Sequence, residues 1–319
     1  MKMNIGSNKL IALTGALLVS ALAIMAEENG IAHYNPGQTA DFIDTLPGYP
    51  SFAYMNIFTY YDGKVGGGQP LPVRDGRVAL NVKATSYSDS SVLLWETPLK
   101  VMGGNYSLFA SIPYTWVTVS GDVQTGRRTE PAKNSTSGLG DIYFVPAALG
   151  WTNGDFKWDG RFGLYAPSGA YSTTSLANPG LGFWTFEPEI TFSWLSSKIG
   201  TEVSVFAGMD FNTENTSANY TSGDVFHIDL TVAQHLPLFG GYVGVGANGY
   251  WMKQFTGDSG SGAVLGAFEL QQLGVGPVVS YIRTIGKTEL AVDLKWVPQI
   301  DVQNTMKGNY IWAKVALVF

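Results

Sequence analysis

Several segments of the chain alternate strictly between apolar and polar residues, and this period of two constrains the fold more than any other feature. In residues 202–212, Val203 and Val205 lie opposite Glu202 and Ser204. Successive side chains of a β-strand point to opposite faces, so each such segment is predicted to be a strand with one apolar and one polar face. The same pattern recurs in residues 106–116, 156–167, 184–194, 226–235, 242–252 and 288–299.

Every charge in these segments falls on the polar face. Arg or Lys on the lipid face at the bilayer midplane costs about 2–4 kcal/mol, so this separation is typical of strands that cross a membrane. Backbone groups in lipid must all be hydrogen-bonded, so such a sheet must close into a barrel. A soluble sandwich would also alternate, but charged residues make up only 14% of the chain, against roughly 25% in soluble domains.

Trp residues near the strand ends fit the aromatic belts of membrane barrels. These residues are Trp116, Trp158, Trp184, Trp194, Trp251 and Trp296. We therefore predict an all-β fold, a transmembrane antiparallel β-barrel.

The chain ends on a further segment of this kind, residues 309–319. One face of it is wholly apolar, and the other carries Lys314. Its last residue, Phe319, resembles the C-terminal signal by which the barrel assembly machinery recognises bacterial outer-membrane barrels. We therefore expect the protein to lie in the bacterial outer membrane, with outer-membrane lipid as a partner.

The N-terminus has the form of a secretory signal peptide, residues 1–26. Lys2 and Lys9 precede an apolar run, and cleavage after Ala23 or Ala26 fits the small residues there. Residues 27–50 contain three prolines and show no periodicity, so we expect an irregular segment that is a candidate plug for the lumen. The barrel is expected over residues 51–319, where no run approaches the roughly 18 apolar residues of a membrane helix.

Turn signals predict twelve strands. They lie near residues 52–62, 91–101, 105–119, 138–151, 156–167, 181–195, 200–212, 224–236, 241–254, 272–285, 288–299 and 309–319. Short turns at 103–105, 152–155, 196–198, 237–240 and 286–287 alternate with long polar loops at 120–137, 168–180, 213–223, 255–271 and 300–308. Such barrels have short periplasmic turns and longer outer loops. Residues 77–86 either form a hairpin in the first outer loop or belong to a barrel of fourteen strands.

The charged and titratable residues of the polar faces are candidates for the lining of the lumen. They are Lys157, Asp159, Arg161, Glu187, Glu189, Glu202, Asp210, His227, Asp229, Glu289, Asp293 and Lys295. Acidic residues predominate among them, which does not favour anions as cargo. The net charge of −6 argues against a nucleic-acid-binding surface.

Three motifs suggest chemistry, and the strand pattern offers a simpler interpretation of each. The G-x-G-x-x-G match at 244–249 lies inside a strand, whereas a nucleotide site needs a strand-to-helix turn. The sequence GDSGSG at 257–262 resembles a protease nucleophile loop but lies in a predicted outer loop. The third is a group of titratable residues on the polar faces. His227 and Asp229 could form a base–orienter pair, and an acidic or metal cluster could form from Glu187 and Glu189 with Glu202 and Asp210. Polar groups fill any barrel lumen, however. We predict no catalytic residue, no metal site and no cofactor.

Five prolines lie inside predicted strands: Pro167, and the four candidates Pro113, Pro146, Pro188 and Pro277. Proline cannot donate to the strand ladder, so each marks a bulge, a strand end or an interrupted pair. An interruption could provide a lateral opening through which an apolar molecule leaves the lumen into the membrane.

Motifs along nearly the whole mature chain resemble the "MetA-pathway of phenol degradation" family, also described as SphA-like outer-membrane transporters. They include Glu28-Asn29-Gly30, His33-Tyr34-Asn35-Pro36-Gly37, Ser137-Gly138-Leu139-Gly140-Asp141-Ile142 with Pro146, Pro167-Ser168-Gly169-Ala170-Tyr171, Asn178-Pro179-Gly180, Tyr220-Thr221-Ser222-Gly223-Asp224 and Gly274-Val275-Gly276-Pro277. The resemblance implies an outer-membrane barrel, often encoded with aromatic-compound degradation, that passes small hydrophobic or aromatic molecules. It assigns no catalytic residues.

These observations predict a channel for passive uptake of small hydrophobic or aromatic compounds. Two alternatives remain open at this point. One is an outer-membrane lipid or ester hydrolase that uses His227 or His235. The other is a structural or adhesive barrel with loop 255–271 or 120–137 as its working surface.

Overall fold

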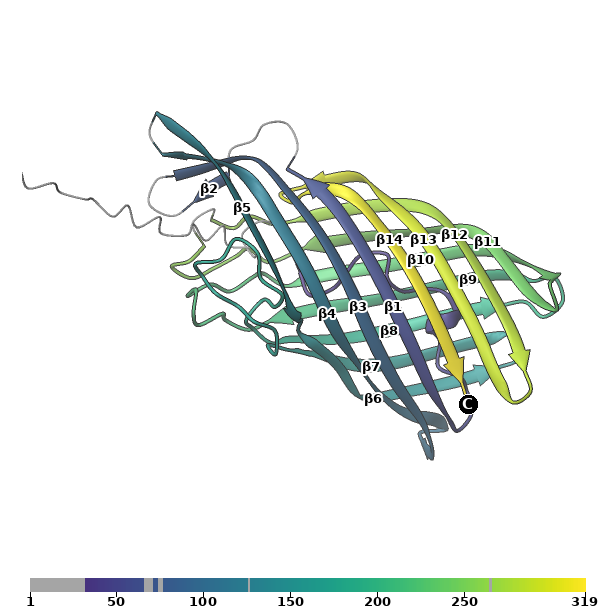
Figure 1. Ribbon diagram of the computed structural model, residues 1–319. Coiled ribbons are helices and arrows are strands. Elements are labelled where there is room, and N and C mark those ends of the chain that lie inside the picture. The colour runs from purple at the N-terminus through teal and green to yellow at the C-terminus, as the bar shows by residue number, and fades with distance from the viewer. Residues whose placement is uncertain (1–31, 66–70, 74–76, 126, 264–265) are drawn as a thin grey trace, which may run out of the picture.

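The computed structural model describes residues 32–65, 71–73, 77–125, 127–263 and 266–319 (Figure 1). The predicted signal peptide, residues 1–26, lies outside the described residues, as does the start of the predicted N-terminal segment. A 3-10 helix, η2 (Phe42–Asp44), precedes the sheet. The strands are β1 (Ser51–Lys64), β2 (Leu71–Val73), β3 (Arg77–Val101), β4 (Gly104–Thr125), β5 (Arg128–Leu139), β6 (Ile142–Asn153), β7 (Phe156–Ala166), β8 (Thr185–Leu195), β9 (Thr201–Asn212), β10 (Val225–Leu238), β11 (Gly241–Gln254), β12 (Gln271–Ile285), β13 (Thr288–Gln303) and β14 (Lys307–Val318). No helix in the described ranges is long and apolar enough to cross a membrane.

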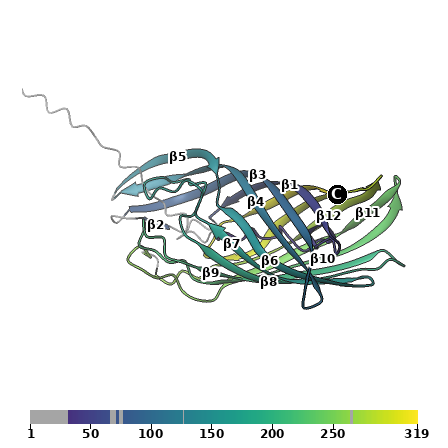
Figure 2. The same cartoon turned by 90° about the horizontal axis from the view of Figure 1, so that it is seen from below.

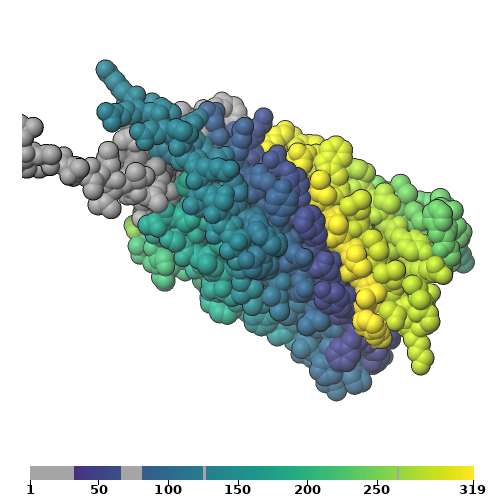
Figure 3. Space-filling model, in the orientation of Figure 1, coloured from purple at the N-terminus to yellow at the C-terminus, as the bar shows by residue number. Residues whose placement is uncertain are grey.

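The sheet closes into a barrel because β1 pairs with both β14 and β3, antiparallel in each case. The last residue continues this seam, since the Phe319 N–H donates to the Phe52 carbonyl at 2.8 Å. Figure 3 shows the outside of the seam, where the purple band of β1 lies against the yellow band of β14. The predicted antiparallel barrel is confirmed.

Of the fourteen strands in the sheet, β2 and β5 stand outside the ring, so twelve strands close it. β2 pairs only with the first residues of β3, and β5 pairs only with β4 beyond Pro113. Figure 2 shows both at the same end of the barrel. The prediction of twelve strands is therefore correct, and a fourteen-stranded barrel is excluded.

The outer end of the barrel differs from the prediction in three places. Residues 77–86 are the upper part of β3, which is one strand of 25 residues. Residues 120–137, predicted as a polar loop, form the hairpin of β4 and β5. Residues 300–308 are mostly strand, and only 304–306 connect β13 to β14. β5 has no buried residue, so its sequence does not need an apolar face. In the upper part of β3, Val82 and Ala84 are buried on the inner face, and the segment continues the strand that begins the barrel wall.

The alternating faces of the strands point in opposite directions, as the sequence pattern requires. In β9, the even-numbered residues from Glu202 to Asp210 are buried, while the odd-numbered residues from Val203 to Met209 are partly exposed on the outer wall. In β14, Lys314 points inward and Val315 outward. The interior therefore collects the polar faces of the strands, and residues 32–50 enter it, visible as the purple trace inside the barrel in Figure 1.

Candidate functional site

The described N-terminal segment, residues 32–50, is bound to charged side chains of the inner wall. On β13, the Lys295 ammonium pairs with the Asp41 carboxylate and donates to the backbone carbonyls of Gly37 at 3.2 Å and Thr39 at 2.9 Å. On β14, Lys314 pairs with Asp44 at 2.7 Å. Such contacts satisfy backbone groups of an irregular segment that has no strand partners.

Strand β10 holds the same segment through Asp229. This carboxylate accepts hydrogen bonds from the Tyr34 hydroxyl, from the Thr39 amide at 3.1 Å and from the Thr39 hydroxyl at 2.9 Å. Burial, followed by the charge of Asp229, raises the pKa of Tyr34 well above its ordinary value, so the hydroxyl remains a donor. Three separate elements thus fix residues 34–44 inside the barrel.

Further contacts bind the remainder of the segment. The Phe42 amide donates to Glu202 at 2.8 Å, and Glu202 pairs with His235 at 2.6 Å. Lys157 of β7 donates to the carbonyls of Leu46 and Pro47, both at 3.2 Å. The charged side of the wall, formed by β7–β10, β13 and β14, is therefore largely occupied by the segment.

Arg161 organises a second group of charges on β7 and β8. Its guanidinium lies 2.7 Å from Asp159 and 3.5 Å from Glu189. The same guanidinium lies over the Phe206 ring, 5.2 Å from the ring centroid. Asp159 also accepts from the Thr191 hydroxyl at 2.6 Å. These charges are buried and paired, as charges in a low-dielectric interior need to be.

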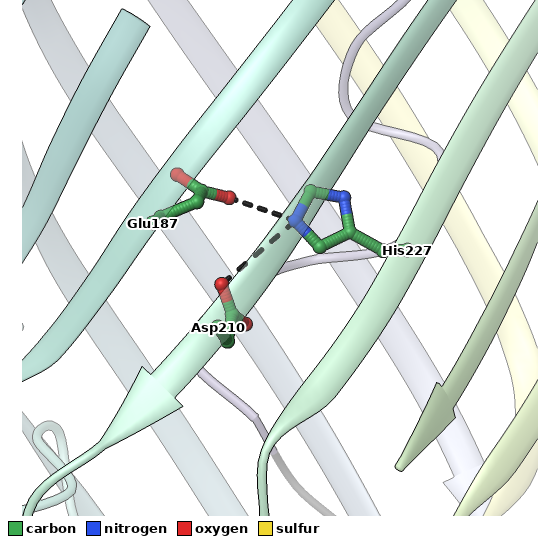
Figure 4. Close-up of side chains that lie close together, drawn as sticks. All are labelled: Glu187, Asp210 and His227. Atoms are coloured by element: carbon green, nitrogen blue, oxygen red, sulfur yellow. Dashed lines mark ion pairs between the residues drawn. The ribbon is translucent and has the colours of Figure 1, made fainter. Parts of the chain in front are cut away.

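Beside this group, Glu187, Asp210 and His227 converge from β8, β9 and β10 (Figure 4). His227 Nε2 lies 3.0 Å from Glu187 Oε1 and 3.8 Å from Asp210 Oδ1. Tyr34 stacks on the imidazole with ring centroids 3.6 Å apart. His227 and His235 therefore both face carboxylates, and within the described residues neither imidazole is hydrogen-bonded to a hydroxyl that could act as a Ser–His type nucleophile.

Two of the predicted lining residues, Asp293 and Glu289, belong to none of the groups described above. Asp293 is fully buried on β13, and neither of its carboxylate oxygens has a hydrogen-bond partner among the described residues. Glu289 lies at the start of β13 and is partly exposed. A role for any of the predicted residues in lining a transport path stays a prediction.

A cavity of about 380 Å³ lies on the other side of the lumen, between the N-terminal segment and strands β1, β3 and β4. Within the described part of these three strands, every side chain that lines it is uncharged. They include Met55, Ile57, Ala84, Val92, Leu94, Phe109, Val117 and Val119, with Ser86, Ser88, Ser90 and Ser111 between them. The cavity thus has one uncharged wall, on β1, β3 and β4, whereas Arg161, Glu187 and Glu189 border it from β7 and β8.

The wall beside this cavity is interrupted at Gly140 and Asp141, between β5 and β6. There β4 changes partner, pairing with β6 up to Ser111 and with β5 from Tyr114 onward. Pro113 lies at this change of partner, and its carbonyl accepts a single bond from the Gly140 amide at 2.9 Å. Gly140, Asp141 and Pro113 all line the cavity.

Loop 167–184 closes the interruption from outside the ladder. The Ser168 hydroxyl bonds the Gly140 carbonyl at 3.1 Å and accepts from the Ile142 amide at 2.9 Å. Asp141 accepts from the amides of Gly169 at 2.9 Å and Leu181 at 2.6 Å. A Cβ on Gly180 would lie 2.7 Å from Asp141 Oδ1, so this close approach needs glycine. Three of the sequence motifs therefore meet at one place in the wall.

The four candidate prolines all lie within strands, not at strand ends. Pro146 lies at an irregularity of the β6–β7 register. Pro188 faces a gap in the β8–β9 ladder, and Pro277 faces one in the β12–β13 ladder. Pro167, which directly follows β7, is the one that marks a strand end. Only Pro113 among the four candidates lines the described cavity.

Sequence reasoning missed the residues that join these features. His33, Asp41 and Asp44 lie in a segment without periodicity, so no pattern assigned them a face. Asp141 belonged to a quoted motif, but its role as the acceptor for His33, Gly169 and Leu181 depends on contacts across the fold.

A family model described as "Putative MetA-pathway of phenol degradation" matches residues 67–315. The chain belongs to this family. The family resemblance drawn from the motifs is thereby confirmed. A search of curated proteins gives no match.

Among solved structures, this family member is similar to an outer membrane channel from Pseudomonas putida F1. The TM-score is 0.59 at 15% identity, over 90% of this chain and 100% of the other. The beta domain of the Bordetella autotransporter Brka aligns with a TM-score of 0.47 at 12% identity, over 85% of this chain and 100% of the other. The first similarity shows that the chain has the fold of an outer-membrane β-barrel.

Proposed function

We propose that the protein is an outer-membrane channel for passive uptake of small hydrophobic or aromatic compounds. The observation that carries this proposal is the cavity against β1, β3 and β4, whose lining on these three strands is uncharged. A dry apolar cavity of about 150 Å³ is large enough for benzene. At about 380 Å³, the cavity has room for a substituted monocyclic aromatic. The solved channel from Pseudomonas putida F1 supports the same role by analogy of fold.

The N-terminal segment acts in this proposal as a plug. Its contacts with Lys295, Lys314 and Asp229 hold it across the charged side of the lumen. A hydrophilic solute would then meet a filled lumen, whereas an apolar solute could use the cavity along its uncharged wall on β1, β3 and β4. The charged residues predicted to line the lumen serve, on this proposal, mainly to hold the plug.

The exit for an apolar solute is proposed at the interruption between β5 and β6. The cavity reaches Pro113, Gly140 and Asp141, where one backbone bond replaces a continuous ladder. A solute that leaves there enters lipid and never crosses the charged side. We propose this site as the lateral opening, in preference to Pro146, Pro188 and Pro277.

Flux into liposomes tests the proposal with two solutes, a small sugar and a monocyclic aromatic. Passage of the aromatic alone supports a plugged barrel with a lateral route. Passage of both at similar rates contradicts the plug, and passage of neither by folded protein contradicts the channel. Deletion of residues 27–50 should admit the sugar, and an unchanged sugar rate would remove the plug from the proposal.

The lateral route has its own test, because the chain contains no cysteine. A Cβ on Gly140 would lie 3.1 Å from Pro113 Cγ, so the double variant Pro113→Cys, Gly140→Cys places two thiols across the interruption. Oxidation should slow the passage of the aromatic, and reduction should restore it. Equal rates in both states would exclude this exit. The two single variants are the controls for the effect of each substitution alone.

A further inference from the structure

Glu187, Asp210 and His227 offer three ligand atoms at one buried point, all within 4.8 Å of one another. The residues are 2%, 0% and 1% exposed, respectively. Zn²⁺ binds His nitrogen and carboxylate oxygen at about 2.0–2.2 Å, so ligand atoms in one shell stand roughly 3–3.5 Å apart. The distances of 3.0 and 3.8 Å from His227 Nε2 are close to that spacing. Figure 4 shows both carboxylates directed at the same nitrogen.

The hydrogen bonding of this cluster is incomplete. Neither carboxylate oxygen of Asp210 has a hydrogen-bond partner of normal geometry in the described chain, although the Tyr34 amide lies nearby. His227 Nε2 also lacks a bond of normal geometry despite the proximity of Glu187. A buried carboxylate is stable only when it is paired or coordinates a metal. The Asp210 carboxylate points toward His227 Nε2, 3.8 Å away, and forms no hydrogen bond within the cluster.

The hydrogen-bond ladder between β8 and β9 is interrupted beside the cluster. The β8–β9 ladder pairs Phe186 with Phe211 and Glu189 with Gly208, but the two residue pairs between them are missing. Pro188 has no N–H to donate there. Glu187 and Asp210 therefore face one another across a gap in the wall. A cation held by both side chains would join the two strands where the backbone does not.

The surroundings suit a bound ion that also contacts the N-terminal segment. Tyr34 covers one face of the imidazole. A Cβ on Gly208, the residue paired with His227 on β9, would lie 2.5 Å from His227 Cε1 and Nε2, so glycine leaves the space that the imidazole occupies. Glu187 and Tyr34 also line the cavity, which gives a small ion a route to the cluster.

We propose that Glu187, Asp210 and His227 bind a divalent transition-metal ion of the Zn²⁺ class, which clamps β8, β9 and β10 together. One nitrogen and two oxygens favour such an ion over Mg²⁺ or Ca²⁺, which prefer oxygen ligands alone. Two carboxylates with a neutral imidazole carry a charge of −2, which a divalent ion balances. This site is independent of the proposed transport function.

Calorimetric titration of the folded, chelator-treated protein with Zn²⁺ alone tests the proposal. We expect saturable binding of one ion per chain and a higher temperature for heat-induced loss of the compact band on gels. Asp210→Asn and His227→Gln should each weaken binding roughly tenfold or more. Both substitutions keep the size of the side chain, and the compact band shows whether each variant has folded.

Glu202→Gln is the matched control. Glu202 and His235 form a buried His–carboxylate pair at 2.6 Å on the neighbouring strands β9 and β10, with one carboxylate in place of two. This variant should bind Zn²⁺ like the unmodified protein. Absence of saturable binding by the unmodified protein would overturn the proposal. Unchanged binding by folded Asp210→Asn, or equal affinity for Mg²⁺, would also overturn it.

Discussion

His33 of the N-terminal segment and Asp141 of the β5–β6 interruption form a buried pair, with Nε2 2.9 Å from Oδ2. The same carboxylate accepts the amides of Gly169 and Leu181 in loop 167–184. One side chain therefore connects the segment inside the barrel, the break in the wall and the loop that closes it. Movement of any one of these three parts should affect the other two.

Replacement of Asp141 tests this connection. Asp141→Ala removes the partner of His33 and the acceptor of the Gly169 and Leu181 amides. Each buried donor left without a partner costs about 1–3 kcal/mol. We expect a lower unfolding temperature and faster passage of a monocyclic aromatic into liposomes. Asp122→Ala, on the outer hairpin where Asp122 bonds Asn81, should change neither. If Asp141→Ala lowers the unfolding temperature but the aromatic passes at an unchanged rate, Asp141 stabilises the fold and does not control passage.

The alternation in the sequence predicted the inward side of the strands because lipid tolerates few charges on the outer wall. Lys157, Asp229 and Lys295 were placed on the polar faces by that pattern, and their side chains point into the lumen. The pattern could not show what they contact. Their partners lie in residues 34–47, where the backbone is irregular and no period assigns a face.

The limits of the strands were harder to predict outside the membrane. β5 reads R-T-E-P-A-K-N-S-T-S-G-L, which resembles a loop because both of its faces meet water. Its structure comes from pairing with β4, from Arg128 opposite Thr125 to Leu139 opposite Tyr114. The uncharged wall on β1, β3 and β4 also depends on the order of strands around the ring, which alternation within single strands does not contain.

The contact between Lys295 and the N-terminal segment should contribute strongly to stability. Lys295→Met keeps much of the volume but removes the ammonium that pairs with Asp41 and donates to the carbonyls of Gly37 and Thr39. Asp41 keeps the Thr231 hydroxyl and the more distant Lys314. Removing one partner of a buried ion pair costs about 3–5 kcal/mol. Urea unfolding in detergent should show a loss of this size, and protease should cleave residues 32–50 faster.

Lys253→Met is the control for that measurement, since Lys253 is exposed at the end of β11. Its effect should stay within about 0.5 kcal/mol. A loss below 1 kcal/mol for Lys295→Met would mean that the segment is held mainly by other contacts.

The outer loops should respond to pH through Asp258. Its carboxylate accepts from the Gln254 side chain at 2.6 Å and the Gly223 amide at 3.0 Å, and burial raises the pKa of Asp258. A folded-state pKa above the unfolded value of about 3.9 means that the folded loop binds the proton more tightly. The stability of the folded loop is then greatest below about pH 4, and it falls as the pH rises through the pKa of Asp258 in the folded state.

Hydrogen exchange of residues 213–224 and 255–263 measures this dependence. After correction for intrinsic exchange, protection should decrease from pH 4 to pH 7 in the unmodified protein. Asp258→Asn keeps an acceptor oxygen and cannot ionise, so its protection should not vary with pH. An equal slope in the two proteins would assign the pH dependence to another group.

Asp89 is a charge on the outward face of β3, in a stretch that the alternation did not assign to a membrane strand. It is exposed and accepts a hydrogen bond from Asn56 on β1 at 2.5 Å. Along the wall it lies between two aromatic pairs, Phe52 with Trp95 and Tyr60 with Tyr87. Aromatic pairs of this kind mark the two membrane interfaces. Asp89 is two residues from Tyr87 and six from Trp95, so it is expected to face lipid close to the interface marked by Tyr60 and Tyr87.

Neutralising this charge should stabilise the barrel in lipid. The cost of a charge on the lipid face falls from roughly 2–4 kcal/mol for Arg or Lys at the midplane to about 0–1 kcal/mol near the interfaces, and it is smaller for acidic residues. We therefore expect Asp89→Asn to gain up to about 1 kcal/mol while it keeps the bond to Asn56. Unfolding in phosphatidylcholine vesicles measures the gain, with Asp122→Asn on the water-exposed hairpin as the control. A loss of stability would mean that the carboxylate has a polar partner in the membrane.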